Sequence, residues 1–335
     1  MNSLVGWIVG GVVLVGVGLL IVMLVFFPSH SDPTEMTTAP GALELHQMTM
    51  TLTDVLGSEP TGEGNAADDY AKALDVYRKD RETWKSLNLK MVSAMENAVV
   101  GDVEKDLMKQ FADRCHDGAK KANMDYCVAY GQKPSIEMEQ ADSKALEKLC
   151  ECLQTCLLYQ QLVVKDNAAA QQIGKDMLIL GWHITKERAY PLTVMAGYNT
   201  QGAACERLAE IYKSDPKLAA ADTVGRLRDY RSQVQTVLTD SQHLHGMWTA
   251  NPLAGDFFNV IDNTKDPAWR VQGLLGLGII KFRSEGDRGD RMYTQRLLEK
   301  YSTSGTELEK RAAKAAKDFT RQEYQHIGNL EVPEP

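Results

Sequence analysis

The first 71 residues contain no lysine and no arginine. A cleavable secretory signal begins with a basic region, so this absence argues against one. The segment has instead an uncharged run over residues 3–27, "SLVGWIVGGVVLVGVGLLIVMLVFF". At 1.5 Å per helical residue the run is roughly 37 Å long, which is enough to cross the hydrocarbon core of a bilayer. We therefore predict a retained single-pass transmembrane anchor, a signal anchor, over residues 1–28.

Basic residues are also absent from the segment after the anchor. Between residues 29 and 71 the chain has eight acids and no base, whereas the cytoplasmic flanks of membrane helices are normally rich in Lys and Arg. We expect the rest of the chain to be periplasmic or extracellular, with the lipid bilayer contacted through residues 3–27. Gly6 and Gly10 have the G-x-x-x-G spacing that brings membrane helices into close contact, although glycine is common in such helices without that role.

Familiar catalytic motifs are missing as well. The chain has no H-E-x-x-H, G-x-S-x-G or G-x-x-x-x-G-K-[ST] sequence, and these patterns mark zinc hydrolases, serine hydrolases and phosphate-binding loops. A net charge of −8 at pH 7 makes the chain a poor match for nucleic acid. We therefore expect no catalytic residue, no cofactor and no nucleic acid, and we expect other membrane or periplasmic proteins as partners.

Helical periodicity, in contrast, is present along most of the chain. Segments rich in Pro, Gly, Ser and Thr predict a flexible tether over 29–64. From Asn65, the expected N-cap of the first helix, apolar residues recur every three or four positions, as in Tyr70, Leu74 and Tyr77. No stretch alternates convincingly like a strand. We predict an all-α fold, with a multi-helix domain over 65–264 and a helical C-terminal part over 265–335. Further helices are expected over 103–115, 119–130, 142–165, 167–188, 201–213, 216–245, 252–262, 266–283, 287–301 and 305–326.

The C-terminal part contains a possible repeat. "DPAWRVQGLLGLGIIKF" and "TELEKRAAKAAKDF" align at a spacing of 40 residues, so that Gly273 matches Ala313 and Gly276 matches Ala316. Small residues at matched positions let one helix pack closely on the next. With an Asp-Pro opening and a period near 40, residues 264–320 resemble a HEAT-type helical repeat. The resemblance implies a solenoid-like arrangement with a scaffolding or binding role.

The cysteines are the main candidates for chemistry, and the chain has six: Cys115, Cys127, Cys150, Cys152, Cys156 and Cys205. Cys152 and Cys156 lie four positions apart on an apolar helical stripe, so we expect both on a buried face and Cys150 off it. Outside the cytoplasm, clustered cysteines indicate disulfides between helices, and Cys150 is best placed to reach Cys115 or Cys127. Buried reduced thiols and a metal or redox site are the alternatives, the metal bound by Cys152, Cys156 and ligands from other helices.

Histidines supply the other candidate ligands. His243 and His245 form an H-x-H pair, which converges on a metal when extended but points in nearly opposite directions on a helix, the setting we expect here. His116 and His183 could complete a zinc site with the cysteines. The sequence around His183, "GWHIT", is more typical of a packed, hydrogen-bonded histidine.

Two functional hypotheses arise from these patterns. The first is a membrane-anchored, extracytoplasmic α-helical scaffold or adaptor for protein–protein interaction or complex assembly. The alternative is a metal- or cofactor-binding helical carrier or enzyme that uses the Cys and His residues. The anchor, the tether and the helical repeat pattern favour the first hypothesis.

The predicted anchor can be tested on protein extracted from its membranes. Mass spectrometry is expected to find the intact N-terminus, because residues 3–27 lack the basic start of a cleaved signal. Deletion of residues 3–27 should move the chain from the membrane fraction to the aqueous fraction. A mature form that begins near residue 30 or 40 would contradict a retained anchor.

Overall fold

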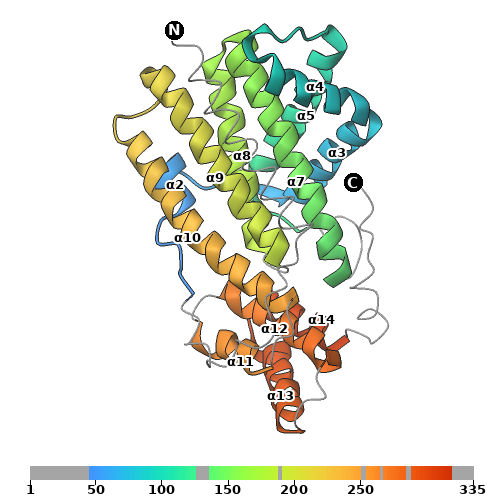
Figure 1. Ribbon diagram of the computed structural model, residues 1–335. Coiled ribbons are helices and arrows are strands. Elements are labelled where there is room, and N and C mark those ends of the chain that lie inside the picture. The colour runs from blue at the N-terminus through green and yellow to red at the C-terminus, as the bar shows by residue number, and fades with distance from the viewer. Residues whose placement is uncertain are drawn as a thin grey trace, which may run out of the picture. The chain divides into compact units, whose positions relative to one another are not determined.

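Helices dominate the described part of the computed structural model (Figure 1). The structure describes residues 45–125, 136–187, 191–249, 254–264, 267–283 and 288–318, all of which belong to one compact unit. The predicted anchor at 3–27, with Gly6 and Gly10, lies outside these residues. Within the described ranges, no helix has both the length and the apolar character needed to cross a membrane.

The elements follow one another as helices and helical turns, with two short strands among them. In chain order they are α2 (Leu52–Leu56), β1 (Gly62–Asn65), α3 (Ala66–Lys79), α4 (Arg81–Ser93), η1 (Met95–Asn97), α5 (Asp102–Ala119), β2 (Lys121–Asn123), α7 (Ile136–Leu158), the π-helical turn η2 (Tyr159–Val164), α8 (Asn167–Glu187), α9 (Pro191–Ser214), η3 (Pro216–Leu218), α10 (Thr223–Thr249), α11 (Ala254–Asn263), α12 (Pro267–Arg283), α13 (Arg288–Ser304) and α14 (Glu307–Asp318). The all-α class predicted from the sequence is confirmed, with the parallel pair of β1 and β2 as the exception.

The first long helix starts where the sequence predicts. The side chain of Asn65 accepts a hydrogen bond from the backbone N–H of Ala67 across 3.1 Å, which caps the start of α3. Tyr70, Leu74 and Tyr77 then lie on its buried face, as their spacing indicates.

The strand β2 lies where the sequence predicts a helix over 119–130, so that prediction is wrong for residues 121–125. Residues 126–130 lie outside the described part of the chain. The helix α5 ends at Ala119, and β2 pairs with β1. The ammonium group of Lys121 forms an ion pair with the buried carboxylate of Asp69, while the Asn65 side chain bonds both the N–H and the carbonyl of Asp125 across 2.8 and 2.7 Å. These contacts hold the chain extended after α5, because a helix would carry both groups away from their partners.

Part of the predicted tether is packed against the helices. Leu52 and Val55 of α2 are buried, and the side-chain oxygen of Gln233 on α10 accepts hydrogen bonds from the backbone of Thr49 and Met50 across 2.9 and 3.0 Å. The segment 45–64 is therefore part of the folded unit, and the rest of the predicted tether, 29–44, lies outside the described residues.

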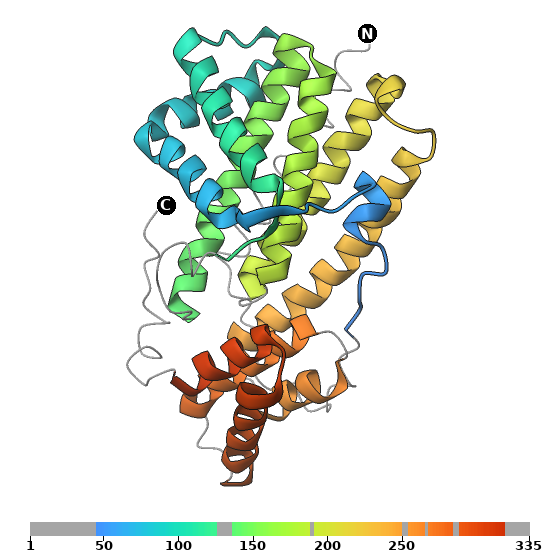
Figure 2. The ribbon, with the colours of Figure 1, turned by 180° about the vertical axis from the view of Figure 1, so that it is seen from behind.

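The helices α8, α9 and α10 run side by side along the molecule (Figures 1 and 2). Gly181 of α8 and Gly197 of α9 permit the closest approach, because a methyl group on either would lie within 3.0 Å of the other's carbonyl oxygen. Gln201 of α9 completes the contact. Its amide donates to Thr185 of α8 across 3.3 Å, and its carbonyl accepts from Tyr230 of α10 across 2.5 Å.

The C-terminal helices α11 to α14 pack through small residues in a similar way. A methyl group on Gly278 of α12 would lie 2.8 Å from the Cα of Ala316 on α14, and one on Gly276 would meet the ring of Phe257 on α11. Buried Glu309 of α14 binds Arg270 of α12 across 2.6 Å. The close packing expected of the small residues is present, and the HEAT-type resemblance itself stays a prediction.

The glycine contact between α8 and α9 predicts a stability difference. Substituting Gly181→Ala or Gly197→Ala should lower the free energy of unfolding by about 1–3 kcal/mol, because the added methyl group meets a backbone carbonyl oxygen of the facing helix as well as side-chain atoms. Gly202→Ala in α9 is the matched control, since its nearest neighbour would be 4.0 Å away, and it should be neutral or slightly stabilising. Urea unfolding measures all three, and equal effects at Gly181 and Gly202 would contradict the close contact.

Candidate functional site

A buried hydrogen-bond chain is centred on His183 of α8. Its ring Nε2 lies 2.9 Å from the backbone oxygen of Lys121, so Nε2 carries the proton and donates it. Nδ1 is therefore the acceptor, and the hydroxyl of Tyr70 donates to it across 3.0 Å. Burial lowers the pKa of His183 to about 4, which leaves the ring neutral near pH 7. The packed, hydrogen-bonded histidine expected from the sequence is confirmed.

A second ionisable pair joins α5 to α8. Nδ1 of His116 lies 3.1 Å from both carboxylate oxygens of Asp176. Burial raises the pKa of Asp176, and the hydrogen bond to Asp176 raises the pKa of His116. Cys115 precedes His116 in the chain, but burial raises the pKa of its thiol well above the ordinary value. A reactive cysteine needs an accessible thiolate, so these groups do not form a nucleophile and base.

The five described cysteines are free thiols, so the disulfide predicted from the sequence is not formed among them, and Cys127 lies outside the described residues. Cys152 and Cys156 are both buried, as their spacing predicts. Cys150 lies close to the hydroxyl of Thr200 on α9, whereas its expected partner Cys115 lies on α5. Burial raises the pKa of Cys150 to about 11 and that of Cys205 to about 12, which keeps both thiols protonated.

Among the described residues, the predicted metal ligands do not form a metal site. His243 and His245 lie on one helix, α10, with His243 exposed and His245 partly buried. Across the described ranges, no group of three or more His, Cys, Asp or Glu side chains could hold a metal ion.

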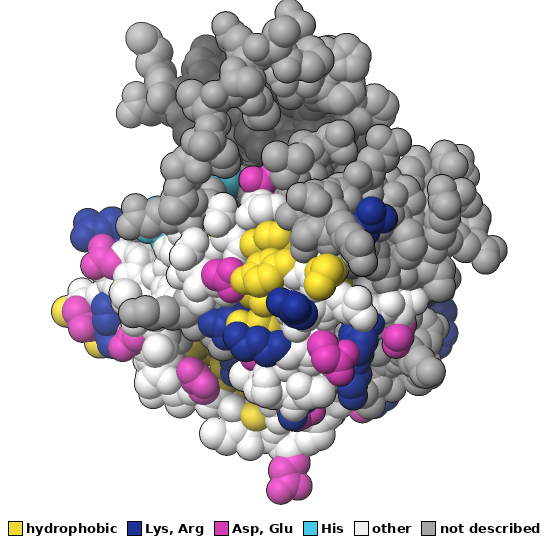
Figure 3. Space-filling view, turned by 90° about the horizontal axis from the view of Figure 1, so that it is seen from below, with side chains coloured by type: hydrophobic (Ala, Val, Ile, Leu, Met, Phe, Trp, Pro, Cys, Tyr) yellow, Lys and Arg dark blue, Asp and Glu magenta, His cyan; other side chains and the backbone are white. Residues whose placement is uncertain are grey.

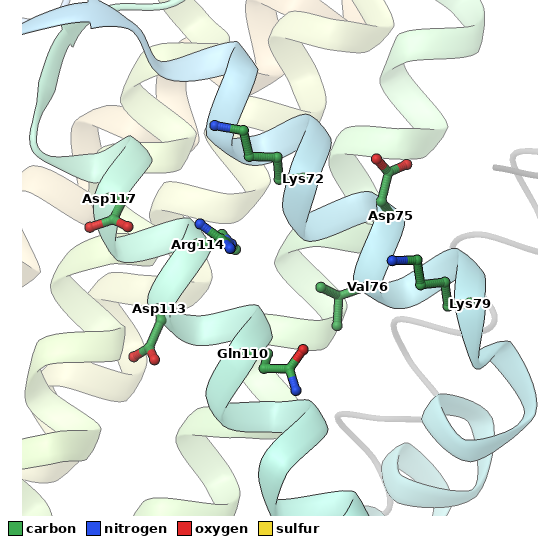
Figure 4. Close-up of a pocket in the computed structure, with 8 residues that line it drawn as sticks. All are labelled: Lys72, Asp75, Val76, Lys79, Gln110, Asp113, Arg114 and Asp117. Carbon is green, nitrogen blue, oxygen red and sulfur yellow. The ribbon is translucent and has the colours of Figure 1, made fainter.

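A groove of about 500 Å³ runs between α3 and α5 on the surface (Figure 4). The two helices are antiparallel, because Tyr70 near the start of α3 packs on Gly118 near the end of α5. We call this the α3–α5 groove, and eight side chains line it: Lys72, Asp75, Val76 and Lys79 on α3, and Gln110, Asp113, Arg114 and Asp117 on α5.

The carboxylates of the α3–α5 groove already have cationic partners. Asp75 pairs with Arg78, Asp113 with Lys109 and Asp117 with Lys120, at distances of 3.2, 2.7 and 3.1 Å. Lys72 pairs with Asp69 across 3.1 Å.

Two cations of this groove have no described ion-pair partner. Among the described residues, neither Lys79 nor Arg114 has an ion-pair or hydrogen-bond partner. Figure 4 shows Arg114 extending from α5 into the space between the helices, whereas the carboxylates of Asp113 and Asp117 point away from α3. The groove therefore has two cations without an ion-pair partner among the residues described, although its lining carries both signs of charge.

Six exposed apolar side chains lie on α4, η1, α5 and η2 or in the turn between η1 and α5. We define this apolar surface by its six members: Leu89, Val92, Met95, Val99, Val103 and Val164. The side chains of Leu89, Val99 and Val103 are 68%, 84% and 75% exposed. Monomers rarely leave contiguous apolar groups in water, and such groups mark interaction sites.

Two ion pairs join the elements that carry the members of the apolar surface. Lys90 of α4 binds Glu104 of α5 across 2.6 Å, and Lys165 after η2 binds Glu96 of η1 across 3.0 Å. Met95 has a backbone φ of 46°, in the left-handed region that residues other than glycine seldom adopt. Such conformations persist where the surroundings enforce them and gather at functional sites.

A second exposed apolar group lies on the C-terminal helices. Figure 3 shows hydrophobic side chains among lysines and arginines on the lower face of the molecule. Met292 and Tyr293 of α13 are exposed, but Tyr293 stacks edge-on against Phe258 at 4.6 Å and donates to Asp262 across 3.0 Å. Because Tyr293 is tied to α11 in this way, the group is less available than the apolar surface of α4 and α5.

Comparison with known proteins gives no relative. No family model, no curated protein and no solved structure matches this chain.

Sequence reasoning missed both surface features. Leu89 and Val103 could have been noticed, because each lies off the buried stripe that Leu87, Met91 and Met108 follow on the same helices. The free cations Lys79 and Arg114 carry no such signal. Which charges of a helix face find partners depends on side-chain positions that the sequence does not show.

The neutral state of His183 predicts a pH dependence of stability. Its pKa of about 4 in the folded chain lies below the ordinary value of 6.5, so the unfolded chain binds the extra proton first and stability falls as pH drops through 6.5 toward 4. Lowering the pH from 7 to 5 should reduce the free energy of unfolding by about 2 kcal/mol through protonation of this histidine. His183→Gln keeps a donor for Lys121 and an acceptor for Tyr70, and it should remove that loss.

Urea unfolding at pH 7 and pH 5 measures the loss of stability for wild type and for His183→Gln. Other titrating groups contribute equally to both proteins, so the difference between the two losses reports on His183. His243→Gln is the control, because His243 is exposed, and it should behave as wild type. An identical loss of stability in wild type and His183→Gln would contradict the assignment.

Proposed function

We propose that this chain is a membrane-anchored, extracytoplasmic α-helical scaffold or adaptor that binds a partner protein. The observation that carries the proposal is the exposed apolar surface of α4, η1, α5 and η2, with Leu89, Val99 and Val103 at least two-thirds in water. Burying such side chains against a partner is favourable by roughly 25 cal/mol per Å² of apolar area. A binding role is also compatible with the protonated, buried thiols and with the neutral His183, since binding requires no reactive side chain.

The charges around the apolar surface favour a protein rather than an anionic lipid surface as the partner. Lipid headgroups are recognised by lysines and arginines that are free to bind them. The described lysines that border the surface are instead each paired with a carboxylate on the chain itself: Lys85 with Glu82, Lys90 with Glu104, Lys105 with Asp102 and Lys165 with Glu96. An apolar centre with a neutral polar rim is the usual anatomy of a protein interface.

The location proposed for the folded unit is inferred from the sequence. The uncharged run at 3–27 supports the anchor, and the absence of Lys and Arg up to residue 71 supports export of the folded unit. Free buried thiols are compatible with an oxidising or a reducing compartment, so they do not bear on this choice.

Substitutions on the apolar surface test the proposed function. Val99→Asp together with Val103→Asp should abolish recovery of the partner, because charged groups cannot be desolvated there without cost. The free energy of unfolding should stay within about 0.5 kcal/mol of wild type, since both side chains are exposed. The measurement is quantitative mass spectrometry of proteins that co-purify with the detergent-extracted full chain.

Met292→Asp is the matched control, as Met292 is an exposed apolar residue on α13, away from this surface. It should leave the set of co-purifying proteins unchanged. If wild type and the Val99/Val103 variant retain the same proteins in the same amounts, the apolar surface is not the contact that the proposal requires.

A further inference from the structure

We propose that the α3–α5 groove binds the carboxylates of an acidic segment of the partner protein, through Arg114 and Lys79. This inference rests on the proposed function, since it names the chemistry that the partner presents next to its apolar contact.

The first argument for this proposal is that two cations of the groove have no described ion-pair partner. Each of its three aspartates is paired with a cation of its own helix, and Lys72 is paired with Asp69. In the described part of the chain Lys79 and Arg114 have no partner. A guanidinium group presents a planar fork of donors that matches a carboxylate, and an ammonium group adds a second cationic donor. An anionic group entering the groove therefore meets two cations that need not give up an existing partner.

The second ground is continuity between the groove and the apolar surface. Val103, Gln110 and Arg114 are separated by seven and four residues, so they lie on one stripe of α5. Val103 belongs to the apolar surface, and the other two line the groove. Along a helix that rises 1.5 Å per residue, Val103 and Arg114 are roughly 17 Å apart. One segment of a partner that crosses α5 lengthwise would reach both features.

The third ground is the shape of the groove. Its lining residues follow the 3–4 spacing of both helices over about two turns, from Lys72 to Lys79 and from Gln110 to Asp117. A volume of about 500 Å³ in this elongated form holds several side chains of a peptide. A single small anion would fill only a fraction of it.

Titration of the detergent-solubilised full chain with hexaglutamate tests the proposal at low ionic strength, with hexalysine and inorganic phosphate as comparison probes. Hexaglutamate should bind saturably and hexalysine should not bind. The double substitution Lys79→Ala with Arg114→Ala should weaken hexaglutamate at least tenfold, which is the scale expected for losing hydrogen bonds to charged groups. The matched control is Lys213→Ala with Arg228→Ala, which removes the same charge from exposed positions on α9 and α10 and should leave the affinity unchanged.

Three outcomes would overturn the proposal. Hexaglutamate could fail to bind, or the two double variants could weaken it equally, which would indicate general attraction to positive charge. Phosphate could also bind as tightly as hexaglutamate, which would make the groove a site for small anions. The titration does not depend on the apolar surface, and Val99→Asp with Val103→Asp tests that surface by partner recovery. Failure of the groove and failure of the proposed function are therefore seen in different measurements.

Discussion

The buried chain from Tyr70 through His183 to Lys121 is the interaction on which the arrangement of the N-terminal helices depends. Each of its polar groups is removed from water, and a buried polar group without a partner is costly. Tyr70 comes from α3, His183 from α8 and the acceptor carbonyl from β2, so satisfying one ring fixes three elements at once. Burial opposes the charge on Asp69, yet ion pairs with Lys121 and Lys72 hold the pKa of its carboxyl below the usual value. The same residue, Lys121, thus anchors α3 a second time.

The buried contacts of Tyr70 and His183 bear on the position of the apolar surface and the α3–α5 groove, which both lie on the layer of α3, α4 and α5. The helices α8, α9 and α10 are held together by small residues and by Gln201 in the interior. The helices α3, α4 and α5 pack against α7 and α8 and present their other faces outward (Figures 1 and 2). Tyr70 and the His116–Asp176 pair lie on the inward side of this layer, whereas Val99 and Val103 are exposed to water.

The sequence predicts the helices well because helical burial is periodic. Asn65 as N-cap and Cys152 and Cys156 on a buried face follow from local spacing alone. The pairing of β1 with β2 does not, because it depends on an ion pair between Lys121 and Asp69 that joins distant parts of the chain. The disulfide expectation had another origin. It came from the inferred compartment, and pairing additionally requires that two thiols face each other. Cys150 faces Thr200 instead.

In the proposed interface, the apolar surface and the cations Lys79 of α3 and Arg114 of α5 differ in their contribution to binding. The apolar surface supplies affinity without direction, because hydrophobic burial depends on area and not on orientation. The cations Lys79 and Arg114 supply direction, since charge complementarity fixes register and rejects partners of the wrong sign. Neither is strong alone, as exposed ion pairs contribute about 0–1 kcal/mol and a small apolar surface accepts many occupants. With Val103 and Arg114 roughly 17 Å apart on one stripe of α5, the proposed interface would select a partner by the spacing between an apolar contact and an acidic one. Such an interface requires α5 to keep its orientation, which the close packing of Gly118 on Tyr70 and the His116–Asp176 pair support.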